Sequence, residues 1–280
     1  MKAYRTITTV VTDPADLTAA FDAATRITAA NEAHLDVICL GLDRTQPGFY
    51  YAGATAVVMQ DSLDQAREDA VALENQVRAK LEGSTFNWSV TGLSAQMVAV
   101  NHLIALRTRF SDLVVLSQPY AKGRGQDLEL ISEAAMFEGD VPVLIQPDTH
   151  DLPERADRIL IGWNESREAL RAVKAALPFL KAASTVNIAI IDPPKHGPER
   201  SDPGGPLSQF LARHGVKAEL SVLSKTMPRV ADVLSRHAND IDADMIVMGA
   251  YSHSRFRESI LGGATRNMLE LTERPLLLTH

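Results

Sequence analysis

Short runs of almost continuous apolar residues recur along this chain, separated by longer stretches in which apolar positions return every three or four residues. Continuous runs of Val, Ile and Leu are typical of strands buried on both faces of a parallel sheet. The runs fall into two sets, 7–12, 35–42, 86–91, 113–117 and 141–146, then 158–163, 186–191, 217–223, 245–249 and 276–279. The pattern therefore predicts five buried strands in each half of the chain.

The stretches between these runs have the periodicity of amphipathic helices. The two clearest apolar stripes are formed by Leu63, Ala66, Ala70, Leu73, Val77 and Leu81 and by Ala169, Leu170, Val173, Ala176, Leu177 and Leu180. Strands that alternate with helices indicate βαβ units with right-handed crossovers. We therefore predict an α/β protein of two tandem three-layer α/β/α domains, each with a five-stranded parallel sheet.

The two halves also match each other in sequence. The segment SDLVVL at 111–116 corresponds to ADMIVM at 243–248, and VPVL at 141–144 corresponds to RPLL at 274–277. The spacing between the two segments is nearly the same in both halves. An internal repeat of one domain is the simplest interpretation.

The length of 280 residues also favours two domains, because single domains commonly have about 100 to 200 residues. Segment 147–155 is polar, contains two prolines and has no periodicity, which is typical of a linker. We therefore predict one domain at 1–150 and a second at 151–280.

Composition restricts the possible functions. The formal net charge of -7 gives no overall attraction to nucleic acid or to an anionic membrane, so we expect neither as a partner. The single cysteine, Cys39, lies in an apolar run and is predicted to be a buried packing residue. The histidines lack metal-ligand spacing, so no metal site is expected. We find neither a signal-peptide pattern nor an apolar run long enough to span a bilayer, and expect a cytoplasmic protein.

The richest stretch for chemistry runs from the end of a predicted strand at Gly249 into the last predicted helix. Gly249 allows a sharp bend and a close approach to a ligand. The pair Gly262-Gly263 exposes unhindered backbone N–H groups at a helix start, where the helix dipole favours an anion. The stretch therefore predicts a phosphate-binding loop.

These residues resemble the universal stress protein (UspA-like) family, in its tandem two-domain type. Nucleotide-binding members of that family have Gly, two residues, Gly, nine residues, then Gly followed by Ser or Thr. The spacing from Gly249 to Gly262 is kept here, but Ser252 replaces the second Gly and Gly263 replaces the hydroxyl residue. Thr265 is an alternative source of a hydroxyl group. The resemblance implies a strand order of 3-2-1-4-5, as in adenine nucleotide alpha hydrolase-like folds.

The resemblance also implies which residues contact a nucleotide. It places the candidate binding site at Asn164, Ile190, Gly249, Ser252, His253, Gly262, Gly263, Ala264 and Thr265. Asn164 stands where the family has an acidic residue, and capping of the next helix is an equally good interpretation of it. Arg255 and Arg257 are candidates for phosphate contacts or for surface pairs with Glu258.

The first half has a degenerate version of the same site. Asp13 is its counterpart of Asn164, and Leu130 stands where the second half has Gly262. The segment from Lys122 to Gly125 is basic and glycine-rich, and is interpreted as a solvated turn in preference to an anion site. We therefore expect the first half to be a structural or regulatory partner of the second.

The leading functional prediction is a stress-response protein that binds an adenine nucleotide (ATP, ADP or AMP), alone or with Mg, in its second half as a sensor or switch. The chain is not expected to be an enzyme. One alternative is a nucleotide-independent interaction protein or scaffold; another is a slow nucleotide hydrolase using Glu258 or His253. The resemblance implies that the two halves pair with each other. A homodimer and an unidentified protein partner are left open.

Overall fold

The computed structural model describes residues 4–44, 55–120, 125–149, 152–153, 155–193, 202–250 and 263–280, with only the backbone described in 55–59. The chain divides into two compact units, Met1–Val143 and Leu144–His280. The division falls within strand β5 (Val143–Gln146), a few residues before the boundary predicted at residue 150. That predicted boundary stays a prediction.

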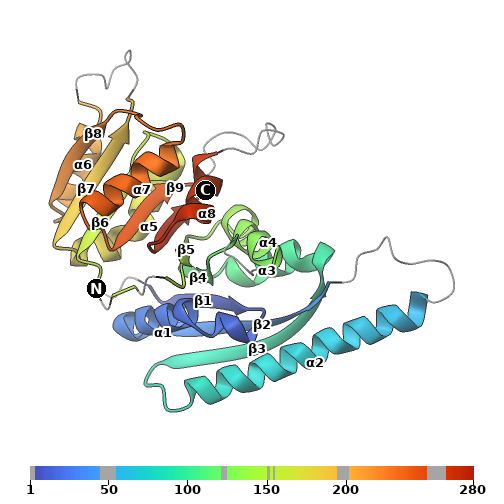
Figure 1. Ribbon diagram of the computed structural model, residues 1–280. Helices are drawn as coiled ribbons and strands as arrows, with labels where there is room; N and C mark the ends of the chain where they lie inside the picture. The colour runs from blue at the N-terminus through green and yellow to red at the C-terminus, as the bar shows by residue number, and fades with distance from the viewer. Residues whose placement is uncertain are drawn as a thin grey trace. The chain divides into compact units, whose positions relative to one another are not determined.

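The first half alternates strands and helices as its apolar pattern predicts (Figure 1). Its elements are β1 (Thr6–Val11), the 3-10 turn η1 (Pro14–Asp16), α1 (Ala19–Asn31), β2 (His34–Asp43), α2 (Thr55–Leu81), β3 (Asn87–Gln96), the 3-10 turn η3 (Met97–Ala99), α3 (Val100–Thr108), β4 (Leu113–Ser117), α4 (Asp127–Glu133), the π-helical turn η4 (Ala134–Glu138) and β5. The strands lie in the order β3-β2-β1-β4-β5, and β1 pairs in parallel with both β2 and β4.

The second half repeats this arrangement. Its elements are β6 (Arg158–Gly162), α5 (Arg167–Ala182), β7 (Thr185–Ile191), α6 (Gly205–Arg213), β8 (Ala218–Leu223), α7 (Val230–Asp240), β9 (Met245–Gly249), α8 (Ala264–Leu271) and β10 (Leu276–Thr279). The order β10-β9-β6-β7-β8, with parallel pairs throughout, is 3-2-1-4-5 read from its other edge. The predicted α/β fold class and the strand order are confirmed.

The glycines on neighbouring strands show that helices cover both faces of the second sheet. A Cβ on Gly162 of β6 would lie 3.2 Å from the side chain of Leu234 on α7. A Cβ on Gly249 of β9 would instead meet the backbone of α5 at Ala169. Since Gly162 is paired with Met248, and successive residues of a strand face opposite sides, α5 and α7 cover opposite faces. The layers are therefore helix, sheet and helix.

The helices bury the stripes that the sequence predicts. In α2 all the stripe residues except Leu63 are buried, and in α5 the buried positions are Ala169, Ala172, Val173, Ala176 and Leu180. Ser166 caps α5, since its Oγ accepts a hydrogen bond from Ala169 N at 3.1 Å. Among the described residues, no helix has an apolar segment of the length needed to cross a membrane.

Candidate functional site

The reversal of strand order in the second half occurs beside its first strand, β6, which lies between β7 and β9. In open α/β sheets, ligands collect at such a point, outside the carboxyl ends of the strands. The chain leaves β6 through Trp163 and Asn164 and leaves β9 through Gly249 and Ala250. These two exits lie side by side because Gly162 is paired with Met248.

Asn164 lies exposed in the turn between β6 and α5. Its Oδ1 accepts a hydrogen bond from Ser166 N at 3.2 Å, and Glu165 between them has a left-handed φ of 62°. The residue that caps α5 is Ser166, so Asn164 shapes the preceding turn and does not cap the helix itself. Its amide group remains at the edge where a ligand would lie.

Gly249 has a role in packing that the sequence interpretation missed. A Cβ at this position would lie 2.4 Å from Ala169 N and 2.7 Å from the carbonyl carbon of Glu168. The φ of Gly249 is not in the left-handed region, so a sharp bend is not the reason for glycine here. Its missing side chain lets the start of α5 lie directly on β9. A close approach to a ligand is not needed to explain it.

Ile190 lies inside β7, with a side chain that is 4% exposed. Ala189 O accepts a hydrogen bond from Trp163 N at 2.9 Å, on the β6 side of the strand. Successive backbone groups of a parallel strand point to alternate neighbours, so those of Ile190 point toward β8. The backbone contact with adenine that the resemblance implies at Ile190 is therefore not available at this residue.

Helix α8 begins beside this edge at Gly263, its N-cap residue. Gly263 is exposed and extended, and no described atom lies within 4 Å of the place a Cβ would take. Ala264 is the first helical residue, and Thr265 is only 4% exposed, so its hydroxyl is not presented at the surface. The predicted residues Ser252, His253 and Gly262 lie outside the described residues, as do Arg255, Arg257 and Glu258.

In the first half, two of the protein's own carboxylates lie at the exit of β1 and at the start of α4. The buried Asp16 Oδ2 accepts hydrogen bonds from Thr12 N at 2.9 Å, Thr12 Oγ1 at 3.1 Å and Asp13 N at 3.1 Å, at the exit of β1. Asp127, the first residue of α4, is buried and its Oδ2 lies 3.0 Å from Arg44 Nη2. Backbone donors and a helix start that would otherwise suit an anion already face negative charge.

In the first half, the position that the repeat aligns with Gly262 lies inside a helix. Leu130, which stands there, is part of α4, and its N–H donates to Gln126 O at 3.2 Å. Lys122 lies outside the described residues, while Gly125 lies two residues before the start of α4. The degenerate site predicted for the first half stays a prediction.

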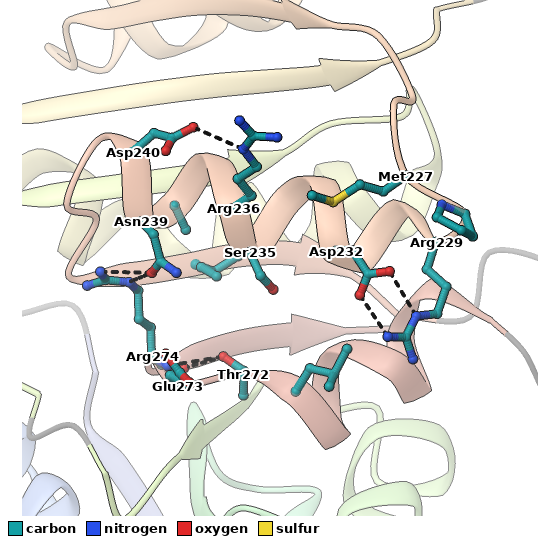
Figure 2. Close-up of a pocket in the computed structure, with 14 residues that line it drawn as sticks. Met227, Arg229, Asp232, Ser235, Arg236, Asn239, Asp240, Thr272, Glu273 and Arg274 are labelled. Atoms are coloured by element: carbon teal, nitrogen blue, oxygen red, sulfur yellow. Dashed lines mark hydrogen bonds and ion pairs between the residues drawn. The ribbon is translucent and has the colours of Figure 1, made fainter.

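A groove of about 730 Å³ runs along α7 in the second half and is bordered by the turn between α8 and β10 (Figure 2). Its three described arginines each have a partner: Arg229 pairs with Asp232, Arg236 with Asp240, and Arg274 with Asn239 Oδ1. The hydrogen bond that Arg229 donates to Asp232 raises the pKa of Arg229 above its ordinary value. Because these cations are already paired, the groove is a poorer phosphate site than the edge at Asn164 and Gly263.

Metal ligands do not cluster in the described part of the chain, where no three His, Cys, Asp or Glu side chains come close enough to hold an ion. Mg, if it accompanies a nucleotide, therefore has no group of protein ligands among these residues. The site as described offers backbone donors, an amide side chain and a helix start. Such groups bind and orient an anion.

Comparison with known proteins supports the assignment of the fold. Residues 155–280 match the model of the Universal stress protein family. A universal stress protein of Synechocystis sp. is 26% identical over 137 residues, which are 49% of this chain and 46% of the relative, so the match spans about half of that curated protein.

Two crystal structures match nearly the whole chain. A universal stress protein from Archaeoglobus fulgidus has a TM-score of 0.74 at 16% identity, with 98% of this chain and 95% of the other covered. A functionally unknown protein from Pseudomonas aeruginosa has a TM-score of 0.58 at 18% identity, with 99% and 93% covered. At these identities the two structures show a shared fold.

Proposed function

We propose that the chain is a stress-response protein of the universal stress protein family, whose model its residues 155–280 match, and that its second half binds an adenine nucleotide as a sensor or switch. The nucleotide lies at the carboxyl edge of β6 and β9, with its phosphates toward the start of α8. Binding of the nucleotide changes how the protein binds its partners. Adenine is proposed on the strength of the family resemblance alone.

The observation that carries this proposal is the contrast between the two helix starts. Helix α4 of the first half begins with the buried carboxylate of Asp127, whereas α8 of the second half begins at Gly263, with open space around it among the described residues. A phosphate is attracted by the positive end of a helix and repelled by a carboxylate placed there. The second half therefore suits a phosphate and the first half does not.

The experiment that tests the proposal places a negatively charged side chain at the start of α8, as α4 already has one at its start. Gly263→Asp and Gly263→Asn differ by one negative charge, and both side chains fit the open space and are good N-caps. Calorimetric titration with ATP should show binding to the wild type, a loss of at least 10-fold in affinity for Gly263→Asp, and a change below about 3-fold for Gly263→Asn. Thermal unfolding of both variants should match or exceed that of the wild type.

Two results would contradict the proposal. One is the absence of heat on titrating the wild type with ATP, ADP or AMP at millimolar concentration. The other is equal affinity of the Asp and Asn variants, which would place the phosphates away from α8.

A second candidate function is an interaction surface that works without nucleotide. Val98, Leu106 and Phe110 follow one another at intervals of eight and four residues along α3 and its flanks, with exposures of 87%, 41% and 81%. Exposed apolar side chains in such a row are typical of protein contact sites. Capture of the same cellular partner by wild type and by Gly263→Asp, with loss of that partner on Phe110→Glu, would favour this function over nucleotide sensing.

Hydrolysis is not part of the proposal. The chain is proposed to hold the nucleotide without turning it over, since the helix start and the amide of Asn164 supply no general base. ATP incubated with the protein and Mg should break down no faster than in a protein-free blank. A rate well above the blank that Gly263→Asp abolishes would show an enzyme instead.

A further inference from the structure

Trp163 occupies a position at the edge of the second sheet that its fold does not explain. Its N–H continues the β6–β7 ladder by donating to Ala189 O at 2.9 Å, so the residue is still extended. Its side chain is only partly buried. In the described part of the chain, the indole N–H makes no hydrogen bond and the ring makes no aromatic or cation–π contact. A tryptophan N–H usually has a partner once the ring is buried; this partly open indole has none among the described residues, so its N–H is free to bond to solvent or to a ligand.

The direction of the Trp163 side chain follows from its neighbour in the strand. Gly162 faces α7, because a Cβ there would lie 3.2 Å from Leu234. Successive residues of an extended chain point to opposite faces, so the indole lies on the other face, the face of α5. The site therefore has an aromatic side chain on the same face as the start of α5.

Trp163 is partly exposed at the carboxyl edge of the sheet. Continuing the registers of β6 by one residue places Trp163 next to Ile190 on β7 and Gly249 on β9. Ile190 is a buried apolar side chain, and the start of α5 packs directly on Gly249. Asn164, exposed and carrying an amide, is the next residue of the chain. An indole plane, an apolar neighbour and an amide at one edge are the groups that hold a flat heteroaromatic base.

We propose that the indole of Trp163 stacks on the base of the bound nucleotide and determines that the site takes a nucleotide in preference to a base-free phosphate. This inference rests on the proposed function and deepens it. The phosphates depend on α8, whereas the base depends on Trp163. The two ends of the ligand are thus recognised by different elements, and mutations should affect them separately.

The experiment uses the intrinsic fluorescence of the full-length protein. The chain has two tryptophans, and the other, Trp88, lies in β3 of the first half with Arg78 5.9 Å from its ring centroid. Trp88→Phe therefore leaves Trp163 as the single emitter. AMP should quench this emission with a midpoint equal to the calorimetric Kd, whereas ribose 5-phosphate and inorganic triphosphate should leave it unchanged.

Matched variants measure the contribution of the ring. Base–aromatic stacking predicts a loss of AMP affinity of about 10- to 100-fold for Trp163→Leu and a smaller loss for Trp163→Phe, which keeps a ring. Affinity for inorganic triphosphate should change by less than about 2-fold in both variants. Far-ultraviolet circular dichroism and thermal unfolding check that each variant is folded, and the quenching experiment needs no substitution at Trp163.

The outcomes distinguish this inference from the proposed function. If AMP binds the wild type but neither quenches Trp163 nor loses affinity in Trp163→Leu and Trp163→Phe, the stacking role is overturned while nucleotide binding stands. Equal losses for AMP and triphosphate would also overturn it, because they would indicate a general structural role. If neither AMP nor triphosphate binds the wild type, the proposed function fails and the stacking role fails with it.

Discussion

Gly249 is the residue at which the sequence and the structure give different reasons for the same amino acid. The sequence places it at the start of a ligand loop, which favours a bend; the structure places the backbone of α5 where its side chain would be. A glycine at a strand end is compatible with both reasons. The position of α5, a helix distant in sequence, decides between these two reasons. The sequence near Gly249 therefore carries no signal for the packing role.

Gly249→Ala should therefore destabilise the protein itself. The new Cβ would lie 2.4 Å from Ala169 N, and backbone atoms cannot move aside as a flexible side chain can. Overpacking of this kind costs about 1–3 kcal/mol in the free energy of unfolding, measured by urea denaturation. Gly263→Ala, at a site with open space, serves as the control and should cost less. Full stability of Gly249→Ala would contradict the packing role.

The single thiol should be inert in the folded protein. Burial raises the pKa of Cys39 from 9.0 to about 12, Glu74 adds to the shift and Arg78 opposes it. The thiolate is the reactive form, so at pH 8 a thiol reagent should label native Cys39 at least 100-fold more slowly than the urea-unfolded chain. Equal labelling rates would mean that the thiol is accessible.

The same pKa shift gives a pH dependence with a defined sign. Between pH 9 and pH 12 the unfolded chain loses the Cys39 proton while the folded chain keeps it. The free energy of unfolding should therefore fall through this range, by about 1.4 kcal/mol per pH unit from this group, and this group should have no effect below pH 9. The predicted burial of Cys39 is confirmed, and the absence of a redox role stays a prediction.

At the scale of elements, the turn between β1 and α1 shows how the first half closes its own site. The Asp16 carboxylate holds Thr12 N, Thr12 Oγ1 and Asp13 N together at the exit of β1. In the second half the carboxylate in the turn from Trp163 to Ser166 is that of the exposed Glu165, and the position that corresponds to Asp16 is Arg167. The repeat thus keeps the elements and changes the chemistry of the turn between them.

Asp16→Ala should destabilise the protein by about 2–4 kcal/mol, because three hydrogen-bond donors lose their acceptor at a buried site. Asp13→Ala is the matched control, since it removes one exposed cap bond to Ala15 N and should cost about 0.5–2 kcal/mol. Denaturant unfolding of both variants measures the difference. An Asp16 variant no less stable than the Asp13 variant would contradict the closing role of the carboxylate.

Most elements could be predicted from the sequence because their apolar patterns are local. The strands at 113–117, 245–249 and 276–279 agree with β4, β9 and β10 to the residue. The third strand was predicted at 86–91, but β3 continues to Gln96, where it pairs with Asp43 of β2. The added residues of β3 are a mixture of polar and apolar types at an edge of the sheet. Their composition therefore does not identify them as strand, whereas their pairing with β2 does.

The limits of helices were harder to predict, because capping depends on turns. Asn164 was a candidate cap of the next helix, yet α5 begins after Ser166, and Asn164 forms the turn before it. Both Asn and Ser are good caps, so composition alone cannot choose between them.

For the whole molecule, the repeat gave the architecture, and the differences between its copies give the proposed function. Both halves have the strand order 3-2-1-4-5, as predicted. The family model matches residues 155–280, which include the open helix start at Gly263 and the exit of β6 at Trp163 and Asn164. Asp16 bonds within its own turn, whereas Asp127 pairs with Arg44 across 83 residues of the chain, so the closure at the start of α4 could not be predicted from a local pattern.

The central claim is that one half of the chain binds a nucleotide and the other is closed by its own carboxylates. Native mass spectrometry of the full-length protein with ATP at rising concentration counts bound nucleotides directly. We predict a single ATP per chain at saturation, and that Gly263→Asp needs at least 10-fold more ATP to reach the same occupancy. Two ATP per chain, or none on the wild type, would contradict the account.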